Sequence, residues 1–108
     1  MLAISRAFGD HQLKMPNLPN DLVSNVPDVT STELVGEDVF LLVACDGLWD
    51  VMDDQSAVNL VLDGAKELSR LSVALDQKAL AEVLARMLVE EAKARGTQDN
   101  VTCLLLML

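Results

Sequence analysis

The sequence has 108 residues, of which 51% are hydrophobic and 3% aromatic, and its net charge at pH 7 is −9. This length predicts one domain, residues 1–108, and the absence of any lysine and arginine cluster excludes nucleic acid and anionic membranes as expected partners. No apolar run reaches the roughly 18 residues of a membrane span, so neither membrane insertion nor secretion is expected.

The first third of the chain is expected to be mostly irregular. Residues 2–5 alternate weakly and predict a short strand. Residues 11–27 contain all three prolines, which remove backbone donors and predict a surface connection. Residues 26–34 alternate well enough to predict a second strand, and a turn at residues 36–38 would join it to the next strand in a hairpin.

A central strand begins at Phe40 and stops abruptly at Asp46, which is followed by Gly47. The short, aliphatic run is typical of a strand buried on both faces. A carboxylate at the mouth of such a strand is costly unless it has a partner. A metal ion is the strongest candidate partner for Asp46.

The last strand shows the same design in reverse order, because Asp99 precedes the apolar residues 101–108. If the two strands pair antiparallel, Asp46 and Asp99 meet at one edge. Two neighbouring carboxylates repel each other unless a divalent cation lies between them. Carboxylate oxygens without a histidine cluster favour Mg²⁺ or Mn²⁺ over zinc.

Between these strands the sequence predicts helices. Asp53 can cap a helix that Gly64 ends or interrupts, and residues 65–75 form either a helix or an ordered loop. The clearest helix covers residues 77–95, where apolar residues recur at helical spacing after a capping Asp76.

Cys45 and Cys103 each lie within an apolar strand, which is typical of small core residues rather than a disulfide framework. They indicate a reducing, intracellular location, cytoplasmic or nuclear.

Three segments resemble a known family: Ser-Arg-Ala-Phe-Gly-Asp at residues 5–10, Ala-Cys-Asp-Gly-Leu-Trp-Asp-Val at 44–51 and Gly-Thr-Gln-Asp-Asn-Val-Thr at 96–102. They look like the three C-terminal motifs of the metal-dependent protein serine/threonine phosphatases (PPM or PP2C type), in the family's order. The family's N-terminal half, with its other metal motif and its phosphate-binding arginine, does not appear. The implied fold is α+β, the C-terminal portion of an α-β-β-α sandwich with mainly antiparallel sheets flanked by helices.

The resemblance implies hydrolysis of phosphoserine and phosphothreonine on proteins, with two or more Mg²⁺ or Mn²⁺ ions in the complete domain. By motif position, Asp46 and Asp99 would be metal ligands, Asp50 would bind a further, weaker ion, and Gly47 would offer its neighbouring carbonyl directly or through water. No substrate-binding residue is identified. Asp10 either helps to order the metal centre or only ends a strand.

The chain alone is expected to be catalytically incomplete. The alternative is a non-catalytic pseudophosphatase or a partner-binding regulatory fragment, and a third hypothesis is a small α+β domain whose acids are solvated turn residues. A cysteine-dependent phosphatase needs an arginine six positions after its catalytic cysteine. The residue six positions after Cys45 is Val51, so Cys45 is excluded as such a nucleophile. Exposed strands make self-association an additional expectation.

Overall fold

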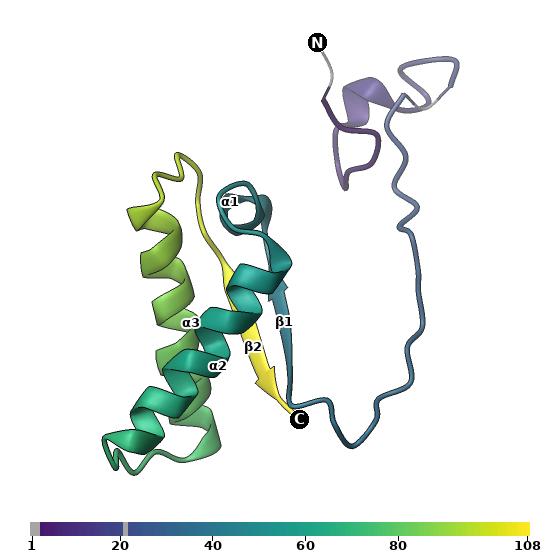
Figure 1. Ribbon diagram of the computed structural model, residues 1–108. Coiled ribbons are helices and arrows are strands. Elements are labelled where there is room, and N and C mark those ends of the chain that lie inside the picture. The colour runs from purple at the N-terminus through teal and green to yellow at the C-terminus, as the bar shows by residue number, and fades with distance from the viewer. Residues whose placement is uncertain (1–2, 21) are drawn as a thin grey trace. The chain divides into compact units, whose positions relative to one another are not determined.

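The computed structural model describes residues 3–20 and 22–108, and the chain forms two compact units, Met1–Glu33 and Leu34–Leu108. Figure 1 shows the elements, which in chain order are η1 (His11–Leu13), β1 (Phe40–Ala44), α1 (Asp46–Trp49), α2 (Asp54–Arg70), α3 (Gln77–Ala94) and β2 (Cys103–Met107). Helices with a small antiparallel sheet confirm the predicted α+β class.

In the first unit, residues 6–7 contact residues 24–28. Ala7 donates a backbone hydrogen bond to the carbonyl of Ser24 at 2.9 Å, and Arg6 forms an ion pair with Asp28. The predicted strand over residues 2–5 is wrong for residues 3–5, which form no strand, and its first residue lies outside the described part. Residues 11–20 and 22–27 form the predicted irregular connection, apart from the single turn of η1, and residue 21 lies outside the described residues.

The predicted hairpin before β1 is wrong. Residues 26–34 have no strand partner within the described chain, and Val29 is 84% exposed. The turn itself is present, since Asp38 donates to the carbonyl of Val35 at 3.0 Å. Alternation alone does not form a strand when no second backbone satisfies its hydrogen bonds.

The predicted antiparallel pairing of the two apolar strands is confirmed. Phe40 lies opposite Met107 at one end of the sheet, and Ala44 lies opposite Cys103 at the other. Side chains on one face are partly or fully buried, whereas those on the other face are exposed. The prediction that the central strand is buried on both faces is therefore wrong, because helices cover only one of them (Figure 1).

The core of the second unit lies where α3 meets β2 and α2. Its fully buried members include Leu48, Val61, Leu84 and Leu88. The helix after Asp53 does not stop at Gly64 but continues to Arg70. A Cβ at Gly64 would come within 2.9 Å of the Leu84 side chain. Gly64 thus permits a close helix approach rather than ending the helix.

Capping residues define the ends of α2 and α3. Asp53 accepts a hydrogen bond from the backbone of Ser56, and Asp76 accepts one from Ala79, each at 2.7 Å. Gly96 takes a φ of +85° after α3, as its residue type predicts.

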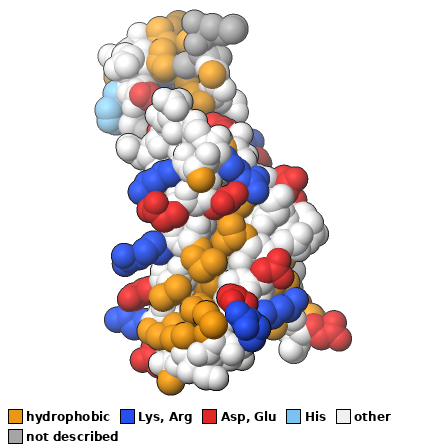
Figure 2. Space-filling model, turned by 60° about the vertical axis from the view of Figure 1, so that its left-hand side comes forward, with side chains coloured by type: hydrophobic (Ala, Val, Ile, Leu, Met, Phe, Trp, Pro, Cys, Tyr) orange, Lys and Arg blue, Asp and Glu red, His pale blue; other side chains and the backbone are white. Residues whose placement is uncertain are grey.

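Seen from the side of α3, apolar side chains lie between acidic and basic ones (Figure 2). None of the helices in the described residues is long and apolar enough to span a membrane.

Candidate metal centre

The short helix α1 fixes Asp46 at the end of β1. Leu48 is fully buried in the core, and the Trp49 indole nitrogen donates to the carbonyl of Ala44 at 3.0 Å. Asp46 itself is exposed in the first turn of α1. Two neighbours therefore anchor the turn while the carboxylate faces solvent.

Cys45 joins this turn to the segment that precedes β2. Its backbone nitrogen donates to the carbonyl of Thr102 at 3.1 Å, and its Sγ accepts from the backbone nitrogen of Thr102 at 3.2 Å. The same thiol donates to the carbonyl of Asn100 at 3.3 Å. The pairing of the two strands thus extends one residue beyond the sheet, towards both acids.

Gly47 is where the two acidic loops touch. A Cβ built on Gly47 would lie 2.0 Å from the carbonyl oxygen of Asn100 and 3.5 Å from the Cβ of Asp99. Only a glycine permits so close an approach. Asp46 and Asp99 therefore flank one backbone contact, which is the convergence that the antiparallel arrangement predicts.

The other two acidic residues of the candidate site, Asp99 and Asp50, are also exposed. The Asp99 carboxylate accepts the backbone N–H of Asn100 at 2.7 Å. The backbone of Asp50 donates to the carbonyl of Asp46 at 2.8 Å, and residues spaced by four lie on the same side of a helix. The structure thus places Asp46, Gly47, Asp50 and Asp99 at one end of the sheet.

This set suits a hard cation only in part. Its donors are carboxylate and carbonyl oxygens, which Mg²⁺ and Mn²⁺ prefer. Within residues 3–20 and 22–108, however, no three acidic, histidine or cysteine side chains are grouped closely enough to hold a metal. The described residues therefore form no complete set of metal ligands.

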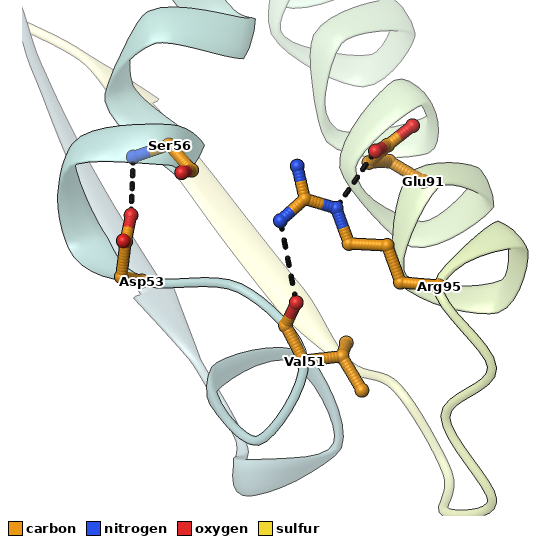
Figure 3. Close-up of polar contacts among 5 residues, drawn as sticks. All are labelled: Val51, Asp53, Ser56, Glu91 and Arg95. Carbon is orange, nitrogen blue, oxygen red and sulfur yellow. Dashed lines mark hydrogen bonds and ion pairs between the residues drawn. The ribbon is translucent and has the colours of Figure 1, made fainter.

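Arg95 joins the end of α3 to the turn after α1 through a brace, its hydrogen bonds to Glu91 and Val51, which the sequence did not reveal. Figure 3 shows its guanidinium between α3 and the turn after α1, where it donates to Glu91 at 2.7 Å and to the carbonyl of Val51 at 3.3 Å. The pairing with Glu91 was expected from helical spacing, but the contact with Val51 joins residues far apart in the chain. Hydrogen bonds from Ser56, assisted by the charge of Arg95, hold the pKa of Asp53 below its usual value.

Each of the two cysteine thiols donates a hydrogen bond to a backbone carbonyl. Both cysteines are free, in agreement with the expectation of no disulfide framework, and both are half-buried rather than fully buried core residues. Burial raises the pKa of the Cys103 thiol, and the nearby Cys45 raises it further. The Cys103 thiol also donates to the carbonyl of Ala85 at 3.4 Å. A neutral, bonded thiol is a packing group.

Comparison with known proteins gives one consistent result. The family model described as protein phosphatase 2C matches residues 1–101. Protein phosphatase 2C homolog 1 of Saccharomyces cerevisiae is 39% identical over 108 residues, and probable protein phosphatase 2C 47 of Oryza sativa is 39% identical over 102 residues. The crystal structure of serine-threonine phosphatase 2C from Toxoplasma gondii superposes with a TM-score of 0.66 at 31% identity and covers 95% of this chain.

These relatives are much longer than this chain. The match covers all of the chain but 31% of the yeast protein, and 94% of the chain but 24% of the rice protein. In the Toxoplasma gondii structure it covers 28% of the solved chain. The chain thus spans about a third or less of these three relatives.

Proposed function

The chain belongs to the protein phosphatase 2C family, and from this premise we propose that it supplies one part of the metal centre of a protein serine/threonine phosphatase. Asp46 and Asp99 would be its main metal ligands, with Asp50 beside them. The substrate class would be phosphoserine and phosphothreonine on proteins. By itself the chain would not turn over substrate.

The contact at Gly47 is the observation that carries this proposal. It brings the loops of Asp46 and Asp99 together although the two acids are far apart in the sequence. The motifs that resemble the family lie in these same two loops. A structural role alone would not require an exposed acid at the end of each strand.

The chain's own residues would bind the metal ions and hold the turn at Gly47 in position. Asp46 and Asp99 would bind Mg²⁺ or Mn²⁺ through carboxylate oxygens, and the turn at Gly47 would let a backbone carbonyl approach the ion. When bound, such ions lower the pKa of a coordinated water and stabilise charge on the transferring phosphoryl group. Cys45 and Leu48 would keep the turn rigid.

Calorimetric titration of the full chain with Mn²⁺ tests the proposal. We expect binding by the wild type and its loss in the double variant Asp46→Asn, Asp99→Asn. The double variant Asp63→Asn, Glu82→Gln is a matched control, because it removes the same charge from two exposed helix positions. We expect the control to bind like the wild type.

The outcomes separate the two parts of the proposal. No binding by folded wild type, or equal binding by both double variants, would contradict a metal centre at Asp46 and Asp99. Mn²⁺-dependent hydrolysis of a phosphopeptide by the isolated chain would contradict its incompleteness. Binding without turnover is the expected result, and it would also be the result for the alternative, a non-catalytic partner-binding fragment. A partner that restores turnover would rule that alternative out.

A further inference from the structure

Asp99 lies in a loop that is hydrogen-bonded to the end of α3. We call residues 95–99 the return loop. The backbone nitrogen of Thr97 donates to the carbonyl of Ala92 at 3.2 Å, and the Thr97 hydroxyl accepts from the backbone nitrogen of Asp99 at 3.4 Å. Asp99 is thus held by the C-terminal end of α3.

Asp46 and Asp50 lie in a second internally bonded segment, residues 46–51, which we call the acidic turn. The backbone nitrogen of Asp50 donates to the carbonyl of Asp46 at 2.8 Å, and that of Val51 donates to the carbonyl of Leu48 at 3.2 Å. Leu48 is fully buried, so the acidic turn is fixed to the core. The positions of the acids relative to one another therefore depend on how the acidic turn is joined to the return loop.

Two contacts join these segments, one near each end of the acidic turn. At its start, the Cys45 thiol donates to the carbonyl of Asn100 at 3.3 Å, and the same carbonyl lies against Gly47. At its end, Nη1 of Arg95 donates to the carbonyl of Val51 at 3.3 Å, across 44 positions of the sequence. A segment held at one point can rotate about it, whereas a second contact fixes its orientation.

The side chain of Arg95 is itself oriented for this second contact. Its Nε donates to Glu91, one turn earlier in α3, at 2.7 Å, and the two side chains are 39% and 37% exposed. Because the guanidinium is a rigid plane, binding Glu91 through Nε directs another nitrogen towards the carbonyl of Val51 (Figure 3). By contrast, Arg70 donates twice to Glu67 of its own helix.

We propose that Arg95 is a positioning residue of the metal centre, which fixes Asp99 relative to Asp46 and Asp50 so that one cation can contact both loops. Ligands must be held in place by supporting contacts to bind a metal well. The identity of the ligands rests on the proposed function, whereas the joining of the two segments rests on the contacts of Arg95 and Cys45.

The charge of Arg95 and its position have opposite effects on a bound cation. A guanidinium close to the site repels a divalent cation, so removing the charge alone would tighten metal binding. Loss of positioning would weaken it. The direction of the change therefore separates the two roles.

Calorimetric titration of the full chain with Mn²⁺ measures that direction. We expect Arg95→Gln to weaken binding about tenfold, the lower end of the loss when residues that support metal ligands are removed. Arg70→Gln is the matched control, because it also removes one arginine and one ion pair within a helix, but at the last residue of α2. It should bind like the wild type.

Amide hydrogen exchange of the metal-free chain, followed by NMR, tests the joining of the segments by itself. Arg95→Gln should accelerate exchange several-fold at the amides of Val51 and Thr97, because each belongs to a segment that the brace holds. Exchange at Val61, in the middle of α2, should not change.

Three results would overturn the proposal: unchanged exchange at Val51 and Thr97, faster exchange at Val61 as well, or Mn²⁺ binding by Arg95→Gln that equals or exceeds that of the wild type. If the folded wild type does not bind Mn²⁺, the proposed function fails, and the exchange data alone decide whether Arg95 joins the two segments.

Discussion

At Gly47 one missing side chain decides whether the two acidic loops can meet. We expect Gly47→Ala to lower the free energy of unfolding by about 1–3 kcal/mol, the usual cost of overpacking, because its methyl group would collide with the carbonyl of Asn100. Urea denaturation measures the change. Gly36→Ala is the control, since a Cβ there meets nothing within 4 Å, and it should change stability by less than about 0.5 kcal/mol. Equal effects at both positions would show that the contact is not tight.

The cap at Asp53 makes stability depend on pH in a defined direction. Hydrogen bonds from Ser56 lower the pKa of Asp53 in the folded chain, so its charge stabilises the fold above its unfolded pKa of about 4. That stabilisation is lost as the pH falls through the lowered folded value. Asp53→Asn can still cap α2 but does not titrate.

We therefore expect wild type to exceed Asp53→Asn in urea midpoint at pH 7, and the difference to shrink towards pH 2. Asp63→Asn, at an exposed position within α2, is the comparison for loss of a charge without loss of a cap. If the difference in urea midpoint between wild type and Asp53→Asn grows as the pH falls, the folded chain does not lower the pKa of Asp53.

At the scale of elements, the crossing of α2 and α3 depends on Gly64. A methyl group there gains about 1 kcal/mol in helix propensity but would lie 2.9 Å from the end of Leu84 and from the end of Met87. Met87 is partly exposed and can move, whereas Leu84 is fully buried. We expect Gly64→Ala to leave stability within about 1 kcal/mol of wild type, because the two effects oppose each other.

Gly64→Val should destabilise the fold by about 1–3 kcal/mol, because a branched side chain cannot be accommodated by moving Met87 alone. Thermal or urea unfolding of both variants measures this. A strongly destabilised Gly64→Ala, or a neutral Gly64→Val, would mean that the helices do not approach each other as described.

The elements also show which parts of the fold the sequence could predict. The strands β1 and β2 and the helix α3 were predicted because their apolar spacing and end signals are local. The hairpin failed because a strand needs a partner, and α1 was missed because four residues carry no periodicity. The close approach of α3 at Gly64 depends on how the two helices pack, which no local signal reveals.

Some features of the candidate site could likewise be predicted from the sequence, and others could not. The meeting of Asp46 and Asp99 followed from antiparallel pairing, which the sequence suggested. The brace from Arg95 to the carbonyl of Val51 was not predictable, because it depends on where the end of α3 lies relative to the turn after α1. The metal role of Asp46, Asp50, Gly47 and Asp99 stays a prediction until the titration is done.

At the scale of the whole molecule, charge and the uncovered face of the sheet act in opposite directions. Six aliphatic side chains on this face, which we call the open face, are 45–65% exposed: Val39, Leu41, Val43, Leu104, Leu106 and Leu108. Net charge of −9 at pH 7 keeps copies apart, and this repulsion vanishes near the sequence pI of about 4.3. The open face remains apolar at every pH. We therefore expect light scattering from the purified chain to rise steeply as the pH falls from 7 towards 4.5.

Leu106→Lys should suppress that rise because it places a charge in the middle of the open face, opposite Leu41. Leu71→Lys makes the same change in net charge at an exposed position outside the open face, so the two variants have the same pI. Any difference between them reports the surface rather than the charge. If both variants scatter alike, the loss of net charge alone explains association at low pH, and the open face does not mediate contact between copies.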